Sequence, residues 1–202
     1  MKDESLGVTF HRDTALALGL QRILAALERR LELEQQVGLY LAGGLAVHLY
    51  TGQRVTTDID AEFTARVAIP RDLTVDVAQE DGTDQILYFD TNYNSMFSLM
   101  HESYQEDAIE LDLELEFIRV FVLSPLDLAV SKLARYADID REDIEALVRS
   151  GLVVADQLER RGFEALSRFI GGQGMVRLNL KEAVAQARAI ERTRATGESP
   201  PS

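Results

Sequence analysis

Hydrophobic residues in the first third of the chain follow a helical period and then a strand period. From Leu16 to Leu31 they recur at steps of three and four residues, which is the pattern of one amphipathic helix. After a short apolar run and Gly43-Gly44, apolar and polar side chains alternate, as in a strand that covers a core. The pattern predicts, in chain order, a helix over 13–36, a strand over 37–42, a helix over 45–51 closed by Gly52, and a strand over 56–63.

The middle of the chain shows strand patterns separated by turn residues. Short strands are expected over 73–77 and 86–89, on either side of the turn-rich stretch EDGTDQ, and residues 92–95 have the composition of a loop. Residues 108–115 then alternate strictly and precede the apolar run 117–123. We expect these last two segments to form a β-hairpin.

Beyond residue 123 the local signals are helical. Ser124, Pro125 and Asp127 have the form of an N-cap, a proline at the first helical position and an acid at the third, which predicts a helix to about residue 137. Asp140 is expected to cap the next helix, which ends at residue 151. The sequence Asn-Leu-Lys-Glu at Asn179 matches a capping box and predicts the start of a last helix, to about residue 194.

These patterns predict an α/β (α+β) fold followed by a helical part. We expect a small mixed sheet with flanking helices over 1–123, a helical part over 124–195 that completes the site, and a polar, disordered tail over 196–202. The sequence contains neither an internal repeat nor a low-complexity tract.

Composition narrows the classes of function. The 202-residue chain has no cysteine, which excludes disulfides, thiolate zinc sites and cysteine nucleophiles. It has no apolar run long enough to span a membrane and no signal-peptide core near its start, so we expect a cytoplasmic protein with no membrane partner. The net charge of −13 repels phosphate backbones and disfavours a general nucleic-acid coat.

Two carboxylates in the predicted strand over 56–63 indicate metal-dependent phosphate chemistry. Asp58 and Asp60 are two residues apart, so on a strand their side chains project from one face while Ile59 turns into the core. Such a pair can bind Mg²⁺, with Mn²⁺ as the alternative, as phosphoryl and nucleotidyl transfer require. A solvated strand face would explain the same two acids without a metal.

Gly43, Gly44 and Arg54 supply the second part of this pattern. Two glycines between a strand and a helix let backbone N–H groups approach an anion closely, and the helix dipole favours negative charge there. Arg54 precedes Asp58 by four residues and is a candidate clamp for phosphate groups. With the carboxylates, these residues predict a site for a metal-bound nucleoside triphosphate. A tight turn and a solvated cation are the structural alternatives.

The stretch LAGGLAVHLYTGQRVTTDIDAEF, residues 41–63, resembles the signature of the polymerase-beta-type nucleotidyltransferase superfamily. In that superfamily a Gly-Gly or Gly-Ser begins a short helix and is followed by Asp-x-Asp on a strand; here 13 residues separate Gly44 from Asp58. The motif Arg-x-Thr-x-Asp-Ile-Asp over 54–60 resembles the corresponding motif of AbiEii-type toxins and their bacterial relatives. The resemblance implies a minimal nucleotidyltransferase fold, with Asp58 and Asp60 as catalytic metal ligands.

A second block, LSPLDLAVSKLARYADIDREDIEAL over 123–147, is similar to the second block of those relatives. There a helical lysine precedes an acidic stretch, an order that Lys132, Asp140 and Asp143 match. The resemblance implies a catalytic role for Lys132, and Arg135, on the same face, is a candidate nucleotide contact; Asp140 and Asp143 are candidate site residues. Helix capping and surface ion pairs would account for the same residues.

The superfamily often uses a third metal-binding acid on a later strand. Asp112, in the stretch AIELDLEL, is our candidate for it, and Asp76 and Asp90 are alternatives that the sequence leaves open.

The sequence therefore predicts a Mg²⁺-dependent nucleotidyltransferase that moves a nucleoside monophosphate from an NTP to an acceptor hydroxyl. The toxin-like resemblance implies a tRNA or protein acceptor, a toxin–antitoxin or phage-defence setting, and a cognate antitoxin-like partner. One alternative is a catalytically silent binding module of the same fold, such as an antitoxin or a regulatory subunit. Another is a kinase-like or phosphohydrolase use of the metal site, which releases ADP or phosphate in place of pyrophosphate.

Overall fold

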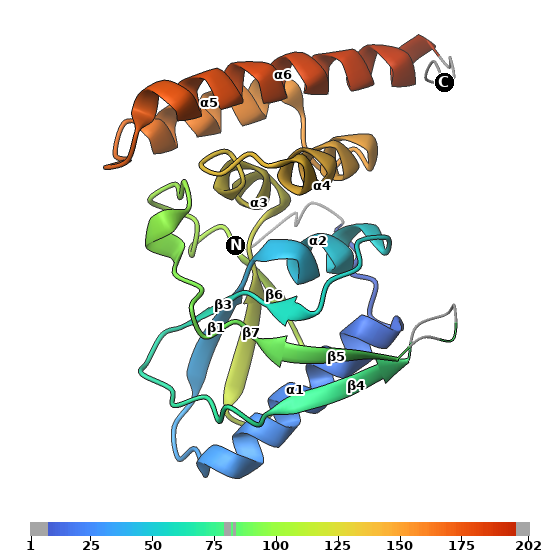
Figure 1. Ribbon diagram of the computed structural model, residues 1–202, viewed down its shortest axis with the longest axis vertical. Helices are drawn as coiled ribbons and strands as arrows, with labels where there is room; N and C mark the ends of the chain where they lie inside the picture. The colour runs from blue at the N-terminus through green and yellow to red at the C-terminus, as the bar shows by residue number, and fades with distance from the viewer. Residues whose placement is uncertain (1–7, 79–81, 83, 197–202) are drawn as a thin grey trace, which may run out of the picture. The chain divides into compact units, whose positions relative to one another are not determined.

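The computed structural model describes residues 8–78, 82 and 84–196 (Figure 1). Within them every strand lies before Leu123 and the remaining chain is helical, which confirms the α/β (α+β) class. The predicted tail beyond Thr196, and part of the predicted turn EDGTDQ, lie outside the described residues. In chain order the elements are α1 (Ala15–Leu31), β1 (Val37–Leu41), α2 (Gly43–Thr51), β2 (Asp58–Ile59), β3 (Ala61–Phe63), β4 (Thr74–Ala78), β5 (Asp84–Phe89), the 3₁₀ turn η1 (Ser95–Phe97), β6 (Ile109–Leu111), β7 (Ile118–Val122), α3 (Pro125–Ser131), α4 (Asp138–Arg149), α5 (Ala155–Leu166) and α6 (Gln173–Thr196).

The chain divides into two compact units. The first contains the described residues of 1–93 and 108–123, and the second contains those of 94–107 and 124–202. The segment 94–107, which the sequence analysis placed in the first part, belongs to the second unit. Arg161 on α5 holds it there, because its guanidinium donates both to Asp107 and to the buried Asp127.

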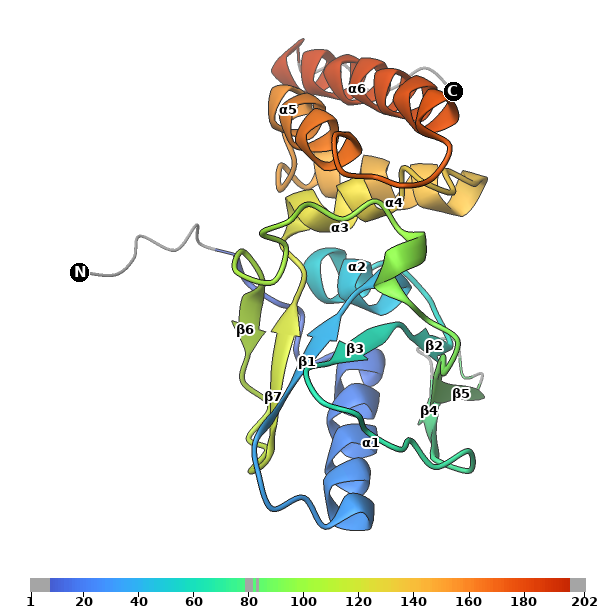
Figure 2. The same ribbon diagram turned by 90° about the vertical axis from the view of Figure 1, so that its left-hand side faces the viewer.

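Among the described residues, the strands of the first unit form two sheets. The strand order is β3-β1-β7-β6 in a four-stranded sheet and β2-β5-β4 in a three-stranded sheet. Strand β1 runs parallel to β7 and antiparallel to β3, so the larger sheet is mixed, as predicted (Figure 2). Strands β6 and β7 pair antiparallel, which confirms the hairpin, although β6 ends at Leu111.

The strand predicted over 56–63 is two strands that belong to different sheets. Strand β2 pairs with β5 and β3 pairs with β1, so the chain passes from one sheet to the other at Asp60. The Asp60 carbonyl accepts the N–H of Ala42 at 2.8 Å, and the Ile59 carbonyl accepts the N–H of Asp90 at 3.1 Å. These bonds hold the main chain on both sides of Asp60.

Helix α1 packs against β4 and β5 of the three-stranded sheet. Its N-cap residue, Thr14, accepts the N–H of Ala17 through its side chain. The helix ends at Leu31, five residues before the predicted end at residue 36, because the next residue, Glu32, takes a left-handed φ of 46°. Side chains on its inner face have no exposed surface: Leu20, Ile23, Leu24 and Leu27. Full burial of each such side chain stabilises the fold by about 1.5–3 kcal/mol.

The second unit begins with the predicted cap of α3. The Ser124 hydroxyl accepts the N–H of Asp127 at 3.1 Å, but the helix ends at Ser131 and does not extend to residue 137. The prediction that Asp140 is the N-cap of α4 is wrong, because the N-cap residue is Ala137. Asp140 is the third helical residue, and its carboxylate accepts the N–H of Ala137 at 2.9 Å.

The predicted start of the last helix at Asn179 is wrong. Helix α6 begins at Gln173, and Asn179 lies inside it, where its amide donates to the Leu133 carbonyl at 2.9 Å. A tertiary partner therefore uses the amide that local sequence suggested as a cap. The helix packs on α4 and α5 through its buried side chains, which are Val176, Leu180, Ala183, Val184, Ala187 and Ile190.

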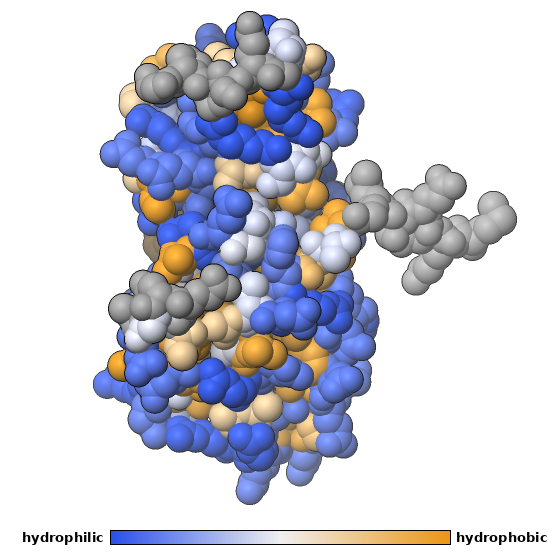
Figure 3. All heavy atoms as spheres, turned by 90° about the vertical axis from the view of Figure 1, so that its right-hand side faces the viewer, coloured by the Kyte–Doolittle hydropathy of each residue, from blue (hydrophilic) through white to orange (hydrophobic). Residues whose placement is uncertain are grey.

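Polar and apolar residues are unevenly distributed on one face of the molecule. On the face shown in Figure 3 hydrophilic residues prevail, and hydrophobic residues occur in separate patches. Within the described part of the chain, no helix combines the length and the apolarity that crossing a membrane requires.

Candidate functional site

The two predicted glycines form the first turn of α2, and the Asp60 carboxylate lies against them. The helix begins at Gly43, two residues before the predicted start, and Gly43 has a left-handed φ of +63°. A Cβ atom at this position would overlap the Asp60 carboxylate and lie 2.6 Å from its Cγ. Only a residue without a Cβ therefore allows Asp60 to approach the start of the helix this closely.

This helix N-terminus suits a negatively charged group. The N-cap residue is Ala42, which has no side-chain acceptor to offer to the N–H groups of the first turn. Those N–H groups have no acceptor within the helix, and the helix dipole places partial positive charge at the same end. Backbone donors and dipole thus favour an anion beside Gly43 and Gly44.

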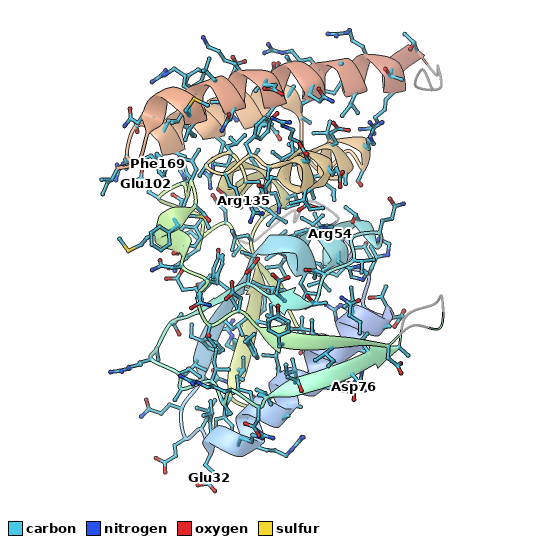
Figure 4. The ribbon with its side chains drawn as sticks, viewed as in Figure 1. Glu32, Arg54, Asp76, Glu102, Arg135 and Phe169 are labelled. Carbon is cyan, nitrogen blue, oxygen red and sulfur yellow. The ribbon has the colours of Figure 1, made fainter. Side chains whose placement is uncertain are left out.

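Arg54 and Thr56 cover the second glycine. A Cβ at Gly44 would lie 3.0 Å from Thr56 Oγ1 and 3.4 Å from Arg54 Nη2, and Figure 4 shows Arg54 beside α2. Thr56 is buried, and its hydroxyl donates to Asp58 Oδ1 in a short hydrogen bond. Thr56 therefore orients the first carboxylate. Thr56 was not among the predicted site residues, although its position two residues before Asp58 placed it on the same predicted strand face.

The first unit thus gathers the predicted residues of the first sequence block around the start of α2. Asp58 and Asp60 are partly exposed on either side of the buried Ile59. The residues brought together are Gly43, Gly44, Arg54, Asp58 and Asp60.

Asp112 does not belong to this group. Across the larger sheet Leu41 pairs with Val122, and Val122 pairs with Ile109, so β6 is nearest to the start of α2 at its first residue. Asp112 follows the other end of β6, is exposed, and uses its carboxylate to accept the N–H of Glu114 at 3.0 Å. Our assignment of Asp112 as the third acid is not supported by this placement, because β6 runs away from the glycines.

The two alternative acids, Asp90 and Asp76, lie at different distances from Asp58 and Asp60 along the three-stranded sheet. Asp90 directly follows β5, whose Phe89 pairs with Ile59, so Asp90 lies beside Asp60 in the register. Asp76 lies on β4 (Figure 4), two residues beyond the row in which Tyr88 pairs with both Thr74 and Asp58. Of the three acids considered, the register favours Asp90.

Lys132, Arg135, Asp140 and Asp143 form an ion-pair cluster in the second unit. Lys132 Nζ lies 2.6 Å from Asp143 Oδ2 and 3.9 Å from Asp140 Oδ1, and all three side chains are at least 93% buried. Arg135 binds Asp140 through two hydrogen bonds of 2.7 Å. The cluster balances two cations with two anions and connects the end of α3 to the first turns of α4. Its assignment to the nucleotide stays a prediction.

Burial and hydrogen bonding act in opposite directions on Asp140. Burial by itself raises the pKa of its carboxyl group. Hydrogen bonds from Arg135 and from the Ala137 N–H, together with the positive charges of Arg135 and Lys132, lower this pKa by more than burial raises it, so the net pKa lies below the usual value. Asp140 is therefore ionised at neutral pH and stabilises both cations of the cluster.

Comparison with protein families decides the assignment of the chain. A family model described as "Nucleotidyltransferase of unknown function (DUF6036)" matches residues 19–188. The chain belongs to this nucleotidyltransferase family. The match includes the glycines and carboxylates of the first unit and the ion-pair cluster of the second. No curated protein showed a significant sequence match to the chain.

Two carboxylates of this nucleotidyltransferase-family protein, Asp58 and Asp60, are of the kind and number that Mg²⁺ takes from a protein. Within residues 8–78, 82 and 84–196, no group of three or more His, Asp or Glu side chains is arranged to hold a metal. Mg²⁺ characteristically binds through one or two carboxylates and takes its other ligands from water and substrate phosphates. The pair Asp58 and Asp60, beside an anion-favouring helix N-terminus, matches that requirement.

Proposed function

We propose that this protein is a Mg²⁺-dependent nucleotidyltransferase that transfers a nucleoside monophosphate from an NTP to an acceptor hydroxyl. The observation that carries the proposal is the contact of the Asp60 carboxylate with Gly43 at the N-terminus of α2. This contact supports the proposal because a carboxylate, which Mg²⁺ can bind, lies beside backbone N–H groups that can donate to phosphate oxygens.

Each residue of the group has a separate task in this proposal. The N–H groups of the first turn of α2 and the guanidinium of Arg54 bind the triphosphate, since both donate to phosphate oxygens. Asp58, oriented by Thr56, and Asp60 would hold the metal. When bound, Mg²⁺ or Mn²⁺ supplies charge neutralisation at the triphosphate and lowers the pKa of the attacking hydroxyl.

The reaction balances without a further reagent. The acceptor oxygen forms a bond to the α-phosphorus of the NTP, and the bond from that phosphorus to the β-phosphate bridge breaks, which releases pyrophosphate. The hydroxyl proton passes to one of the two carboxylates. The protein's contribution is chiefly position and charge, as in phosphoryl transfer generally.

We propose a protein hydroxyl as the acceptor, in a toxin–antitoxin or phage-defence setting with an antitoxin-like partner. The support is the resemblance of Arg54 to Asp60 to AbiEii-type toxins, and the net charge of −13, which disfavours tRNA as the acceptor. Transfer of a labelled nucleotide to protein or to tRNA in a cell extract would distinguish the two acceptors.

Thermal unfolding with nucleotides tests the proposal. We would measure the Tm with each of the four NTPs, with and without Mg²⁺, for the wild type and for Asp58→Asn/Asp60→Asn. A ligand at one hundred times its Kd adds about 2.7 kcal/mol, or roughly 5–10 °C for a chain of this size. The matched control is Asp76→Asn/Asp112→Asn, which removes the same charge outside the group.

We expect a Mg²⁺-dependent rise in Tm that the Asp58/Asp60 variant loses and the control retains. No shift with any NTP at millimolar concentration would refute the nucleotide site and favour the silent binding module. Release of ADP or free phosphate in place of pyrophosphate would favour the kinase-like or phosphohydrolase alternative.

A further inference from the structure

His48 lies on the face of α2 that carries the second glycine. It follows Gly44 by four residues, so both project from the same side of the helix. The residues after α2 fold back over this face: the side chains of Arg54 and Thr56 lie at Gly44, and the Arg54 main chain lies at His48. Arg54 therefore spans one turn of the helix, with its carbonyl at His48 and its guanidinium at Gly44.

The His48 ring makes a hydrogen bond at each of its nitrogens. Nδ1 lies 2.6 Å from the Arg54 carbonyl oxygen, and Nε2 lies 2.8 Å from Thr14 Oγ1. Because a carbonyl only accepts, Nδ1 must carry the proton, and Nε2 of a neutral ring then accepts the Thr14 hydroxyl. Thr14 in turn accepts the N–H of Ala17 as the N-cap of α1.

A neutral ring agrees with its surroundings. His48 is only 6% exposed, and burial lowers its pKa from the usual value by more than the hydrogen bond with the Arg54 carbonyl raises it. The ring is therefore held in one tautomer and one orientation between α1 and the segment after α2.

We propose that His48 is a positioning residue of the nucleotide site: it fixes the main chain of Arg54 along α2 and so places the Arg54 guanidinium beside Gly44. This role rests on the proposed function. It explains why a polar ring is buried in a helix whose other buried residues are largely apolar, since a hydrophobic side chain could not bind the Arg54 carbonyl.

Two substitutions separate the two ends of the ring. The amide nitrogen of Asn is as many bonds from Cα as Nδ1, so His48→Asn can keep the bond to the Arg54 carbonyl. The terminal amide of Gln corresponds to Nε2, so His48→Gln can reach Thr14 but loses Arg54. Both variants remove ring volume, and we expect similar decreases in Tm for the two.

Affinity for nucleotide should differ between these variants. Isothermal titration with each of ATP, GTP, CTP and UTP in Mg²⁺ would give the Kd. We expect His48→Gln to raise the Kd about tenfold, the scale of a weakened hydrogen bond to a charged group, and His48→Asn to retain most of the affinity. In an Arg54→Gln background, His48→Gln should have no further effect on the Kd.

Other outcomes would overturn this role in distinguishable ways. If both variants weaken binding equally, or if the effect of His48→Gln persists in the Arg54→Gln background, His48 is structural only. If Arg54→Gln leaves the Kd of the wild type unchanged, Arg54 is not a phosphate ligand and positioning it is irrelevant. If the wild type binds no NTP, the proposed function fails, and this role fails with it.

Discussion

Gly43→Ala tests the close approach between the start of α2 and Asp60. Alanine would be forced into a left-handed φ of +63°, and its Cβ would collide with the Asp60 carboxylate. The nearest main-chain restraint on Asp60 is the 2.8 Å bond from the Ala42 N–H to its carbonyl, so its backbone cannot retreat without breaking that bond. Relief has to come from the side chain of Asp60 or from the helix start.

Two terms set the size of the effect. The left-handed conformation costs a non-glycine residue about 1–2 kcal/mol. Crowding of a well-packed contact adds about 1–3 kcal/mol. We therefore expect Gly43→Ala to lower the free energy of unfolding by about 2–5 kcal/mol, with a fall in Tm of about 2–4 °C for each kcal/mol.

Gly82→Ala is the matched control. Gly82 also has a positive φ, +81°, but no described atom lies within 4 Å of a Cβ placed there, so this variant reports the backbone term alone. Urea denaturation of both variants gives the difference, which we attribute to Asp60. Adding Asp60→Ala to Gly43→Ala should recover part of the loss, because it removes the two atoms nearest to the new Cβ.

Either of two results would refute a steric conflict between a Cβ at Gly43 and the Asp60 carboxylate. One is an equal loss of stability in Gly43→Ala and Gly82→Ala. The other is strict additivity of Gly43→Ala and Asp60→Ala, since contacting residues should show an interaction energy.

Two further predictions concern the second unit. Arg161→Met leaves Asp127, which is 1% exposed, without its bidentate partner, and we expect a loss of about 3–5 kcal/mol in urea denaturation, whereas Arg188→Met on the surface should barely change the midpoint. Because the pKa of Asp140 is lower in the folded than in the unfolded chain, its ionised carboxylate stabilises the fold. This stabilisation is fully present above about pH 4 and is lost as the pH falls through the folded-state pKa. Acid titration of Tm should thus show a steeper fall below about pH 4 for the wild type than for Asp140→Asn, and equal slopes would contradict the role of Arg135 in holding Asp140 ionised.

Local signals in the sequence were sufficient where the structure depends on neighbouring residues. The helical period of α1 and the Ser124 cap of α3 involve contacts within a few residues, and both were predicted correctly. The residues of the first block were predicted to lie together for the same reason: Gly43 to Asp60 is one short passage that contains helix α2 and strand β2, so its residues are close in the sequence.

Signals that depend on distant partners were misread or absent. Asn179 matched a capping box, yet its amide bonds Leu133, which is 46 residues away. Asp112 was chosen as an acid on a late strand. Only the register of β6 against β7 shows that it follows the end of β6 that lies away from Gly43 and Gly44. Local pattern carries no information about register between segments far apart in the chain.

The sequence by itself determined the fold class and the nucleotidyltransferase family, because hydrophobic periodicity and the order of Gly-Gly and Asp-x-Asp are local properties. Tertiary structure alone decided that the chain changes sheets at Asp60, that Thr56 orients Asp58, and that His48 binds the Arg54 carbonyl. The alternation of residues 56–63 is the same for one strand as for two, so the pattern cannot reveal the switch. The pairing of a strand, or the carbonyl that a histidine nitrogen binds, depends on how segments pack against one another in the folded chain. Local sequence does not contain this information.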